Sequence, residues 1–498
     1  MSLVLIKNAR IVNEGEIFEG DVLIDGEFIV DIDTSISSKS ADTTVIDAEG
    51  KYLIPGLIDD QVHFREPGLT HKGTIESESK AAIAGGITSF IEMPNTVPQA
   101  TTQELLEPRG GIFTGLTHKG TIETESKAAI AGGITSFIEM PNTVPQATTQ
   151  ELLEKKFEIA SKTSYANYSF MFGGTNDNLE ELLKTNPANV AGIKLFLGSS
   201  TGNMLVNDEK VLEKIFSSTK MLIAVHCEDE ATIKANLETY KEEYGDDIPV
   251  KFHPKIRSEE ACYLSSSKAV KLAKKTGARL HVFHLSTAKE TELFSNKGPV
   301  EKKQITAEVC VHHLWFDESD YESKGNFIKW NPAIKTAYDK EGLLKALLDG
   351  KIDVIATDHA PHTKEEKEQV YTKAPSGGPM VQHALPALLK MFQQEKISIE
   401  KIIEKMCHNP AKIFKIEKRG FIKKGYYADL VLVDISSPWT VTKDNILYKC
   451  GWSPFEGTTF YSKITHTFVN GHLAYKYGKF NDGHKGKRLL FNRTNEKN

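Results

Sequence analysis

The amino-acid sequence predicts an α/β protein, in which a TIM-type (β/α)8 barrel carries a small β domain built from both chain ends. Three observations lead to this prediction. Short apolar runs alternate with helix-like stretches through the middle of the chain, polar residues follow many of these runs, and both ends carry strand-and-turn patterns instead. A chain of 498 residues is too long for one ordinary domain, but its length suits a large barrel with a smaller second domain.

The predicted barrel occupies residues 54–419 and contains eight strand-like runs. Buried parallel strands have nearly continuous apolar sequences, and eight of them separated by helices are typical of this barrel. The eight runs are residues 54–59, 89–94, 167–172, 191–197, 221–226, 279–285, 305–311 and 352–358.

The predicted β domain combines residues 1–53 with residues 420–498. The first segment contains IKNARIV, DVLIDGEFIVDID and TTVIDAEG, in which strand-forming residues are separated by turns at Gly and Asp. The stretches ADLVLVD and HTFVNGHLAYKYGKF show the same pattern of strands and turns near the end of the chain. We therefore expect the two ends to pair in one sheet outside the barrel.

A near-exact duplication interrupts the barrel pattern. Residues 68–107 recur at 115–154 with a single Ser-to-Thr change. Each copy contains a helix-like segment, the strand-like segment ITSFIEMPN and the start of another helix, whereas a closed barrel has one place for such a unit. Because loops tolerate insertions better than helices do, we expect the chain to leave the barrel within PNTVPQAT, with Asn95 inside the barrel and Asn142 extruded.

The composition excludes several classes of function. The formal net charge is −6 and no long run carries one sign, so we expect no nucleic-acid partner and no membrane surface. No apolar stretch approaches the ~20 residues of a membrane helix, and the N-terminus resembles a strand rather than a signal peptide. The five cysteines form no CxxC pair, which is typical of free thiols in a reducing compartment. We therefore expect a cytoplasmic protein.

Polar residues recur at the predicted carboxyl ends of the strands, where TIM barrels carry their functional groups. A lone histidine there is more often structural. Several histidines with a carboxylate at one end of a barrel, however, suit zinc and leave a position for water, which predicts a hydrolytic metal centre. The residues in question are Asp59, Gln61, His63, Arg65, Lys194, His226, His284, Asp358, His359 and His362.

Lys194 is unusual because it lies inside the apolar run AGIKLFLGSS. A buried ammonium group is destabilising unless it is paired, neutralised or chemically changed. Uptake of carbon dioxide would convert the amine into an anionic carbamate, which can bridge two cations. Lys194 is therefore a candidate metal ligand.

At these residues the chain resembles the amidohydrolase superfamily, and more narrowly the dihydroorotase family of pyrimidine biosynthesis, with its dihydropyrimidinase and allantoinase relatives. The resemblance covers nearly the whole chain apart from the duplicated block, and its markers include PGLIDDQVHFREPG, MPNT, GIKLFLGSS, VHCE, HLST, IATDHAPH and SGGP. It implies a metal-dependent hydrolase that interconverts L-dihydroorotate and N-carbamoyl-L-aspartate by opening or closing one cyclic amide bond.

The resemblance also implies a role for each metal ligand. His63 and Asp358 would bind one metal ion, and His226 and His284 would bind a second. A carbamylated Lys194 would bridge the two, so one or two zinc ions are expected per chain. Asp358 would also be the catalytic residue that moves a proton from the attacking water to the leaving amide nitrogen.

The same resemblance implies a set of substrate-binding residues. Arg65 would hold the substrate carboxylate, because a planar guanidinium group meets a carboxylate with two charge-assisted hydrogen bonds. The other residues that would line this pocket are Asn95 or its duplicate Asn142, Asn331, His362, Gly378 and Pro379.

Gln61 departs from the family pattern, which usually has His-x-His after the Asp. An amide oxygen is a weaker zinc ligand than an imidazole, so the first metal position could be weak, empty or completed by water. A one-metal enzyme remains compatible with the sequence, because one zinc ion can both activate water and polarise a carbonyl group.

Two other functions stay open. A dihydropyrimidinase, hydantoinase or allantoinase would act on substrates without the ring carboxylate, which would leave Arg65 and Asn95 without a partner. A non-catalytic paralogue that acts as a scaffold is suggested by Gln61 and the duplication, although only one ligand position departs from the pattern. We expect a small-molecule substrate, and we leave open whether the chain forms a homodimer.

Overall fold

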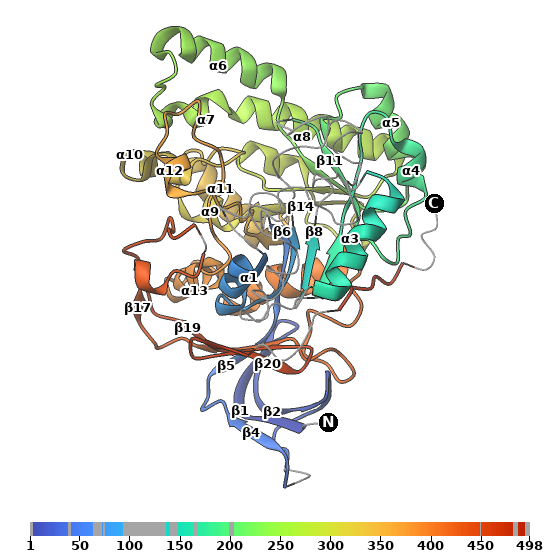
Figure 1. Cartoon of the computed structure of the whole chain (residues 1–498), viewed down its shortest axis with the longest axis vertical. Helices are drawn as coiled ribbons and strands as arrows, with labels where there is room; N and C mark the ends of the chain where they lie inside the picture. Colours follow the sequence, from blue (N-terminus) through green and yellow to red (C-terminus); the bar gives the residue numbers. More distant parts are fainter. Residues whose placement is uncertain are drawn as a thin grey trace, which may run out of the picture.

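The computed structural model of the chain has a barrel of strands and helices that stands on a β-rich layer formed by the two chain ends (Figure 1). Four predicted site residues, namely His63, Arg65, Asn95 and Asn142, lie outside the part that the structure describes. The structure describes residues 3–37, 41–62, 72, 75–92, 136–139, 148–163, 167–198, 204–448, 450–481 and 487–493.

The β-rich layer is a nine-stranded sheet among the described residues. The strand order is β21-β20-β19-β16-β5-β1-β2-β3, and β4 pairs with β1. The two chain ends meet where β16 runs antiparallel to β5, with Leu430 opposite Pro55 and Leu432 opposite Leu53. The strands are β1 (Leu3–Asn13), β2 (Glu16–Asp25), β3 (Phe28–Asp33), β4 (Thr44–Asp47), β5 (Tyr52–Pro55), β16 (Leu430–Asp434), β19 (Lys463–Val469), β20 (His472–Lys476) and β21 (Lys479–Phe480).

The pairing of the two chain ends agrees with the strand-and-turn pattern that they share in the sequence. One face of this sheet packs its alternate apolar side chains into a core of its own, which includes Ile11, Leu53, Leu430 and Phe468. The division of the chain into domains at residues 53 and 420 stays a prediction.

The expected strand at residues 54–59 is in fact two strands in two different sheets. β5 ends at Pro55 in the small sheet, and β6 (Leu57–Val62) opens the barrel. Gly56 lies between them, and a Cβ atom there would stand 1.8 Å from Oγ1 of Thr88. Only glycine allows this close approach of the chain to β7 (Ile87–Glu92), so the single apolar run divides at that residue.

The barrel strands are parallel and follow one another in chain order. Their sheets run β6-β7-β8-β9 and β10-β11-β12-β13-β14-β15, and Met171 alone separates β9 from β10 along the chain. The remaining barrel strands are β8 (Ser136–Glu139), β9 (Asn167–Phe170), β10 (Phe172–Gly173), β11 (Ile193–Phe196), β12 (Ile223–His226), β13 (Leu280–Val282), β14 (Ile305–Cys310) and β15 (Val354–Ala356).

Both copies of the duplicated block contribute a strand to the barrel sheet. β8 comes from the second copy, and it pairs with β7 of the first copy and with β9. Phe137 lies opposite Phe90 on one side and opposite Tyr168 on the other. The expectation that the second copy is extruded is therefore wrong for its strand. SFIE has the same sequence in both copies, and an apolar strand satisfies its backbone N–H and C=O groups best within a sheet.

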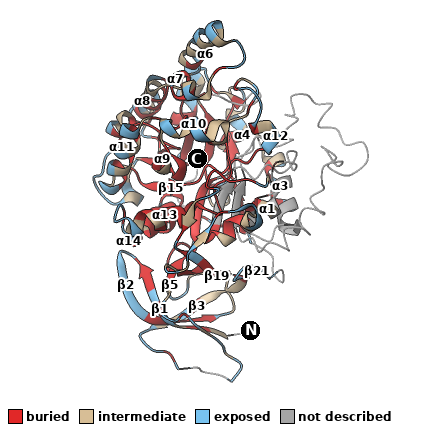
Figure 2. Cartoon of the chain, turned by 90° about the vertical axis from the view of Figure 1, so that its left-hand side faces the viewer, coloured by how far each residue is buried: buried red, intermediate tan, exposed pale blue. Residues whose placement is uncertain are grey.

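Helices connect the barrel strands and cover their outer side, while the buried residues concentrate inside (Figure 2). Local signals set their limits: α8 begins after Ser258, whose side chain accepts from the N–H of Ala261, and ends at Gly277 with a φ of +77°. No helix of the described residues is long and apolar enough to cross a bilayer.

The helices differ widely in length. They are α1 (Ile75–Ala84), α3 (Gln150–Thr163), α4 (Leu179–Leu183), α5 (Glu209–Ser218), α6 (Glu230–Tyr244), α7 (His253–Ile256), α8 (Glu259–Thr276), α9 (Val311–Trp315), α10 (Tyr321–Lys324), α11 (Ala337–Leu348), α12 (Lys364–Lys367), α13 (Ala384–Gln393), α14 (Ile399–Ile403) and α15 (Asn409–Phe414).

Candidate metal centre

Four predicted site residues lie in or just after neighbouring parallel strands of the barrel. Lys194 belongs to β11, and His226 is the last residue of β12, opposite Phe196 in the ladder. His284 and Asp358 each follow a strand by two residues, after β13 and β15. Their φ angles are 40° and 46°, so the backbone takes an uncommon left-handed turn at both positions.

His226 and His284 face each other with their ring nitrogens. Nδ1 of His226 lies 2.9 Å from Nε2 of His284, and the ring planes are nearly perpendicular at 80°. Burial lowers the pKa of both imidazoles from the ordinary value of 6.5, that of His284 far more. Both rings are therefore neutral near pH 7, which is the form that binds a metal ion.

A carboxylate orients the His226 ring. Oε2 of Glu228 lies 3.1 Å from Nε2 of His226, so this nitrogen carries its proton towards Glu228 and Nδ1 keeps the lone pair that faces His284. Burial opposes the charge of Glu228, but the guanidinium group of Arg257, which pairs with it, lowers its pKa to about 2. This arrangement of carboxylate and histidine is typical of metal ligands in proteins.

Lys194 is buried, with 1% of its surface exposed. Burial lowers its pKa from 10.5 to about 7, although the negative charges of Glu308, Asp358 and Cys227 act to raise it. The amine lies 4.0 Å from the ring centre of Phe283, which is an apolar setting. A large fraction of the amine is therefore neutral at pH 7, and a neutral amine can react with carbon dioxide.

Gln61 is buried, and its side chain faces a cysteine. Oε1 of Gln61 lies 3.7 Å from Sγ of Cys310, at the end of β14. Asp59, two residues earlier, accepts a hydrogen bond of 2.6 Å from Oγ1 of Thr357 and another from the Thr357 amide. Asp59 therefore serves to hold the start of the segment that carries Asp358.

A second charged cluster lies within the barrel, at residues that the sequence patterns did not single out. Nε2 of His281 lies 3.5 Å from Oδ2 of Asp60 and 3.4 Å from Oε2 of Glu308. Burial alone would lower the pKa of His281, but the two carboxylates raise it to about 9. Glu308 and His281 are polar residues inside apolar strands, which is the same signal that singled out Lys194.

The predicted substrate-binding residues in the described part of the chain lie in the loops that follow β14 and β15. His362 contacts the Ser376 carbonyl oxygen at 3.0 Å through Nε2, and its Nδ1 lies 3.1 Å from Nζ of Lys72. Asn331 precedes a cis peptide bond, and its Oδ1 is buried without a hydrogen-bond partner among the described residues. That oxygen remains available as an acceptor.

Gly378 and Pro379 are buried beside the segment after β15. The carbonyl oxygen of Gly378 accepts a hydrogen bond of 3.0 Å from the amide of Ala360. A Cβ atom on Gly378 would stand 2.7 Å from the ring of Trp330, so this position requires glycine. These contacts hold the Gly378 segment against the Asp358 segment.

The donor atoms of this site fit a divalent metal ion. Two neutral imidazole nitrogens face each other, the buried amine of Lys194 lies close enough to affect both imidazoles, and the charge of Asp358 acts on that amine. Imidazole and carboxylate ligands are those that zinc and related metals prefer. The structure thus brings His226 and His284 together and lets the charges of Lys194 and Asp358 act on this region, whereas His63 lies outside the described residues.

Comparison with protein families is consistent with this site. The sequence profile of the amidohydrolase family matches residues 101–474, and the dihydro-orotase-like profile matches residues 50–110. The chain belongs to the amidohydrolase family, which is metal-dependent.

Within that family the chain is similar to curated dihydroorotases. It is 33% identical to the dihydroorotase of Carboxydothermus hydrogenoformans over 480 residues. This alignment covers 95% of this chain and 98% of the relative. It is also 31% identical to the dihydroorotase of Methanosarcina acetivorans over 463 residues. That alignment covers 91% of this chain and 88% of the relative.

Solved structures confirm the predicted fold class, a TIM-type barrel with a small β domain. The L-hydantoinase (dihydropyrimidinase) of Arthrobacter aurescens superposes with a TM-score of 0.83 and 25% identity, covering 98% of this chain and 99% of that one. The dihydropyrimidinase of Brevibacillus agri superposes with a TM-score of 0.79 and 23% identity, covering 99% and 100% of the two chains.

Proposed function

We propose that the protein is a dihydroorotase, a cyclic amidohydrolase that interconverts L-dihydroorotate and N-carbamoyl-L-aspartate. One observation carries the proposal: Lys194, His226, His284 and Asp358 converge in a chain that matches curated dihydroorotases over 95% of its length. The reaction hydrolyses or closes one cyclic amide bond. This reaction is a step of pyrimidine biosynthesis.

Zinc is the metal that we assign to the site. His226 and His284 would hold one ion, and Asp358 with His63 would hold another, with Lys194 as a carbamate between them. When bound, zinc supplies Lewis acidity that activates water and polarises a carbonyl group. Gln61 offers only an amide oxygen at the first position, so one zinc ion per chain is as compatible with these residues as two.

The proton transfer is assigned to Asp358. Its carboxylate takes a proton from the attacking water and gives it to the amide nitrogen as that nitrogen leaves the ring. Asp358 lies two residues after β15, and its negative charge raises the pKa of the Lys194 amine, which supports this assignment.

Recognition of the substrate carboxylate is assigned to Arg65 and to Asn95 or its duplicate Asn142. His362, Asn331 and the Gly378–Pro379 backbone would line the rest of the pocket. The buried Oδ1 of Asn331 has no partner among the described residues, which supports this assignment because a substrate N–H would satisfy it.

The test is an assay of dihydroorotate hydrolysis on a sample whose metal content is measured by elemental analysis. We expect activity with one or two zinc ions per chain. Asp358→Asn should lower kcat by roughly 10²–10⁴-fold, the usual contribution of a general acid–base group. Asp349→Asn, at the C-terminal end of α11, is the matched control and should leave kcat unchanged. The proposal fails if protein supplied with zinc and bicarbonate leaves both compounds unchanged.

A dihydropyrimidinase or hydantoinase activity is the second candidate. The observation in its favour is the close superposition on the L-hydantoinase of Arthrobacter aurescens, with a TM-score of 0.83. Hydantoin and dihydrouracil lack the ring carboxylate that Arg65 would bind. Faster hydrolysis of hydantoin than of dihydroorotate by the same sample would favour this second activity.

We also propose a cytoplasmic protein with a composite β domain, formed by residues 1–53 and 420–498, beside a barrel domain of residues 54–419, and we leave open whether two chains form a homodimer. The antiparallel pairing of β5 with β16 supports the composite domain. Light scattering coupled to gel filtration tests the dimer, and a mass of one chain would rule it out. Calorimetry tests the domains, since two separate unfolding transitions are expected for a barrel domain and a β domain.

A further inference from the structure

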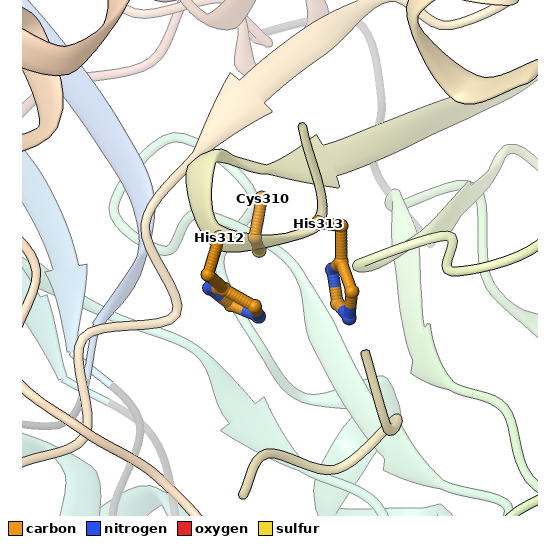
Figure 3. Close-up of side chains that lie close together, drawn as sticks. All are labelled: Cys310, His312 and His313. Carbon is orange, nitrogen blue, oxygen red and sulfur yellow. The ribbon is translucent and has the colours of Figure 1, made fainter. Parts of the chain in front are cut away.

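A second group of metal-ligating side chains lies on the barrel beside the candidate metal centre. Figure 3 shows Cys310, His312 and His313, which come from the end of β14 and the first turn of α9. One ligand atom of each lies within 4.8 Å of the other two, and all three residues are buried. In this view the sulfur of Cys310 lies between the two imidazole rings.

The contacts of His313 leave one ring nitrogen ready for a cation. Nε2 of His313 lies 3.1 Å from the carbonyl oxygen of Pro332. A carbonyl group only accepts hydrogen bonds, so Nε2 carries the proton and Nδ1 keeps its lone pair. Nδ1 is buried and has no hydrogen-bond partner among the described residues. Metal-bound histidines are commonly held in this way, with the other nitrogen donating to a carbonyl oxygen.

His312 is the second imidazole of this group. Its ring is fully buried and stacks on Trp330, with the ring centres 4.4 Å apart and the planes at 14°. The backbone of Thr357 interacts with the ring and raises its pKa, but neither ring nitrogen makes a hydrogen bond of good geometry within the described part of the chain. Burial and the neighbouring His313 lower the pKa of His312 far below its ordinary value, so the ring is neutral. A buried polar group without a partner is destabilising, and a cation would remove that penalty.

Cys310 supplies a softer ligand to the same space. Its Sγ lies 3.7 Å from Oε1 of Gln61 and 3.7 Å from Oε1 of Glu308. Burial and the nearby carboxylates raise the pKa of the thiol well above its ordinary value, so the sulfur carries a proton when no cation is present. The Gln61 amide oxygen, at a position where an imidazole was expected, thus borders this cluster.

We propose that Cys310, His312 and His313 form a zinc site of their own, separate from the His226–His284 pair, which adds one zinc ion to the one or two ions of that centre. The ligand atoms of one tetrahedral zinc ion stand about 3.3–3.6 Å apart, so small side-chain rotations bring these atoms to bonding distance. Binding of Zn²⁺ displaces the thiol proton to solvent and forms one zinc–sulfur bond. A thiolate with two imidazoles selects zinc over magnesium or calcium, which prefer oxygen ligands.

Cobalt substitution tests this site without using activity. A cobalt(II)–thiolate bond gives an intense near-ultraviolet charge-transfer absorption, which imidazole and carboxylate ligands do not give. We expect this absorption in the cobalt-loaded protein and its complete loss in Cys310→Ser, with one zinc ion fewer per chain. Cys407→Ser is the matched control, because Cys407 is also a buried thiol but contacts the Pro55 carbonyl oxygen instead. That variant should keep the full absorption.

A second variant separates loss of the ligand from loss of the fold. His313→Gln removes the free Nδ1, and we expect it to weaken the absorption while circular dichroism stays unchanged. The proposal is overturned if the cobalt-loaded wild-type protein lacks the absorption, or if Cys310→Ser retains it. Because this readout needs no substrate, a failure of the dihydroorotase assay with the absorption present would refute the proposed function and leave the zinc site standing.

Discussion

Nδ1 of His226 lies 2.9 Å from Nε2 of His284, although 58 residues separate the two histidines along the chain. They meet because β12 and β13 are neighbouring parallel strands, with Ala224 opposite His281 in the ladder. Two nitrogens bound to one tetrahedral zinc ion stand about 3.3 Å apart, so a slight separation of the rings admits the ion. The barrel thus holds this pair close to its metal-binding geometry.

The orientation of His226 depends on Glu228, and this leads to the first prediction. Glu228→Gln replaces a charged acceptor with an amide, so the lone pair of His226 is held less firmly towards His284. We expect zinc affinity to fall by roughly 10–100-fold, the usual effect of losing such an outer partner. Competition with a chelator measures this affinity. Glu230→Gln, on the exposed first turn of α6, is the control, and equal affinities in the two variants would contradict the prediction.

Lys194 gives the second prediction. In Lys194→Ala the carbamate cannot form, and we expect kcat to fall by more than about 100-fold, because loss of a ligand exceeds loss of an outer partner. The substitution opens space beside Phe283, where added propionate can supply a carboxylate and restore part of the activity. Lys194→Met fills that space and should not respond to propionate. Unchanged activity in Lys194→Ala would rule out a role in metal binding.

The third prediction concerns the stability of the β-rich layer in acid. Burial and nearby lysines lower the pKa of His466 from 6.5 to about 4. Between these pH values the unfolded chain binds more protons than the folded chain, so the free energy of unfolding falls as the pH falls through this window. His466→Gln cannot take up that proton, and its stability should decline less from about pH 6.5 to about pH 4.

Urea unfolding across this pH range checks the third prediction. His472→Gln is the matched control, because His472 lies at the start of the neighbouring strand β20 and is partly exposed. It should follow the wild-type curve. The same acid dependence in His466→Gln and wild type would contradict the assignment to His466.

The fourth prediction concerns the duplicated block. Deletion of residues 96–142 leaves one copy, and β7 would then pair directly with β9. Since SFIE is identical in β7 and β8, Phe90 would take the place of Phe137 opposite Tyr168. We expect a higher soluble yield and unchanged specific activity. A clear loss of activity in the soluble deletion variant would show that the second copy has a role.

Much of the candidate site could be predicted from the sequence because its residues occur in short, local patterns. Lys194 inside an apolar strand and Asp358 in IATDHAPH were recognisable, and parallel strands bring their carboxyl ends to one edge. The Asp60–His281–Glu308 cluster was missed: Glu308 and His281 carry the same signal as Lys194, but no local pattern shows that they meet. Only the strand order brings the three within 4.8 Å of one another.

The sequence by itself determined the fold class, the joining of the two chain ends and the chemical types of the metal ligands. Hydrophobic periodicity and residue type are local properties of the sequence, so they can be recognised without knowledge of the tertiary structure. Only the tertiary structure decided that both copies of SFIE join the sheet, that Gly56 divides one apolar run, and that Gln61 faces Cys310. Each of these depends on contact between distant segments, which local sequence patterns do not specify.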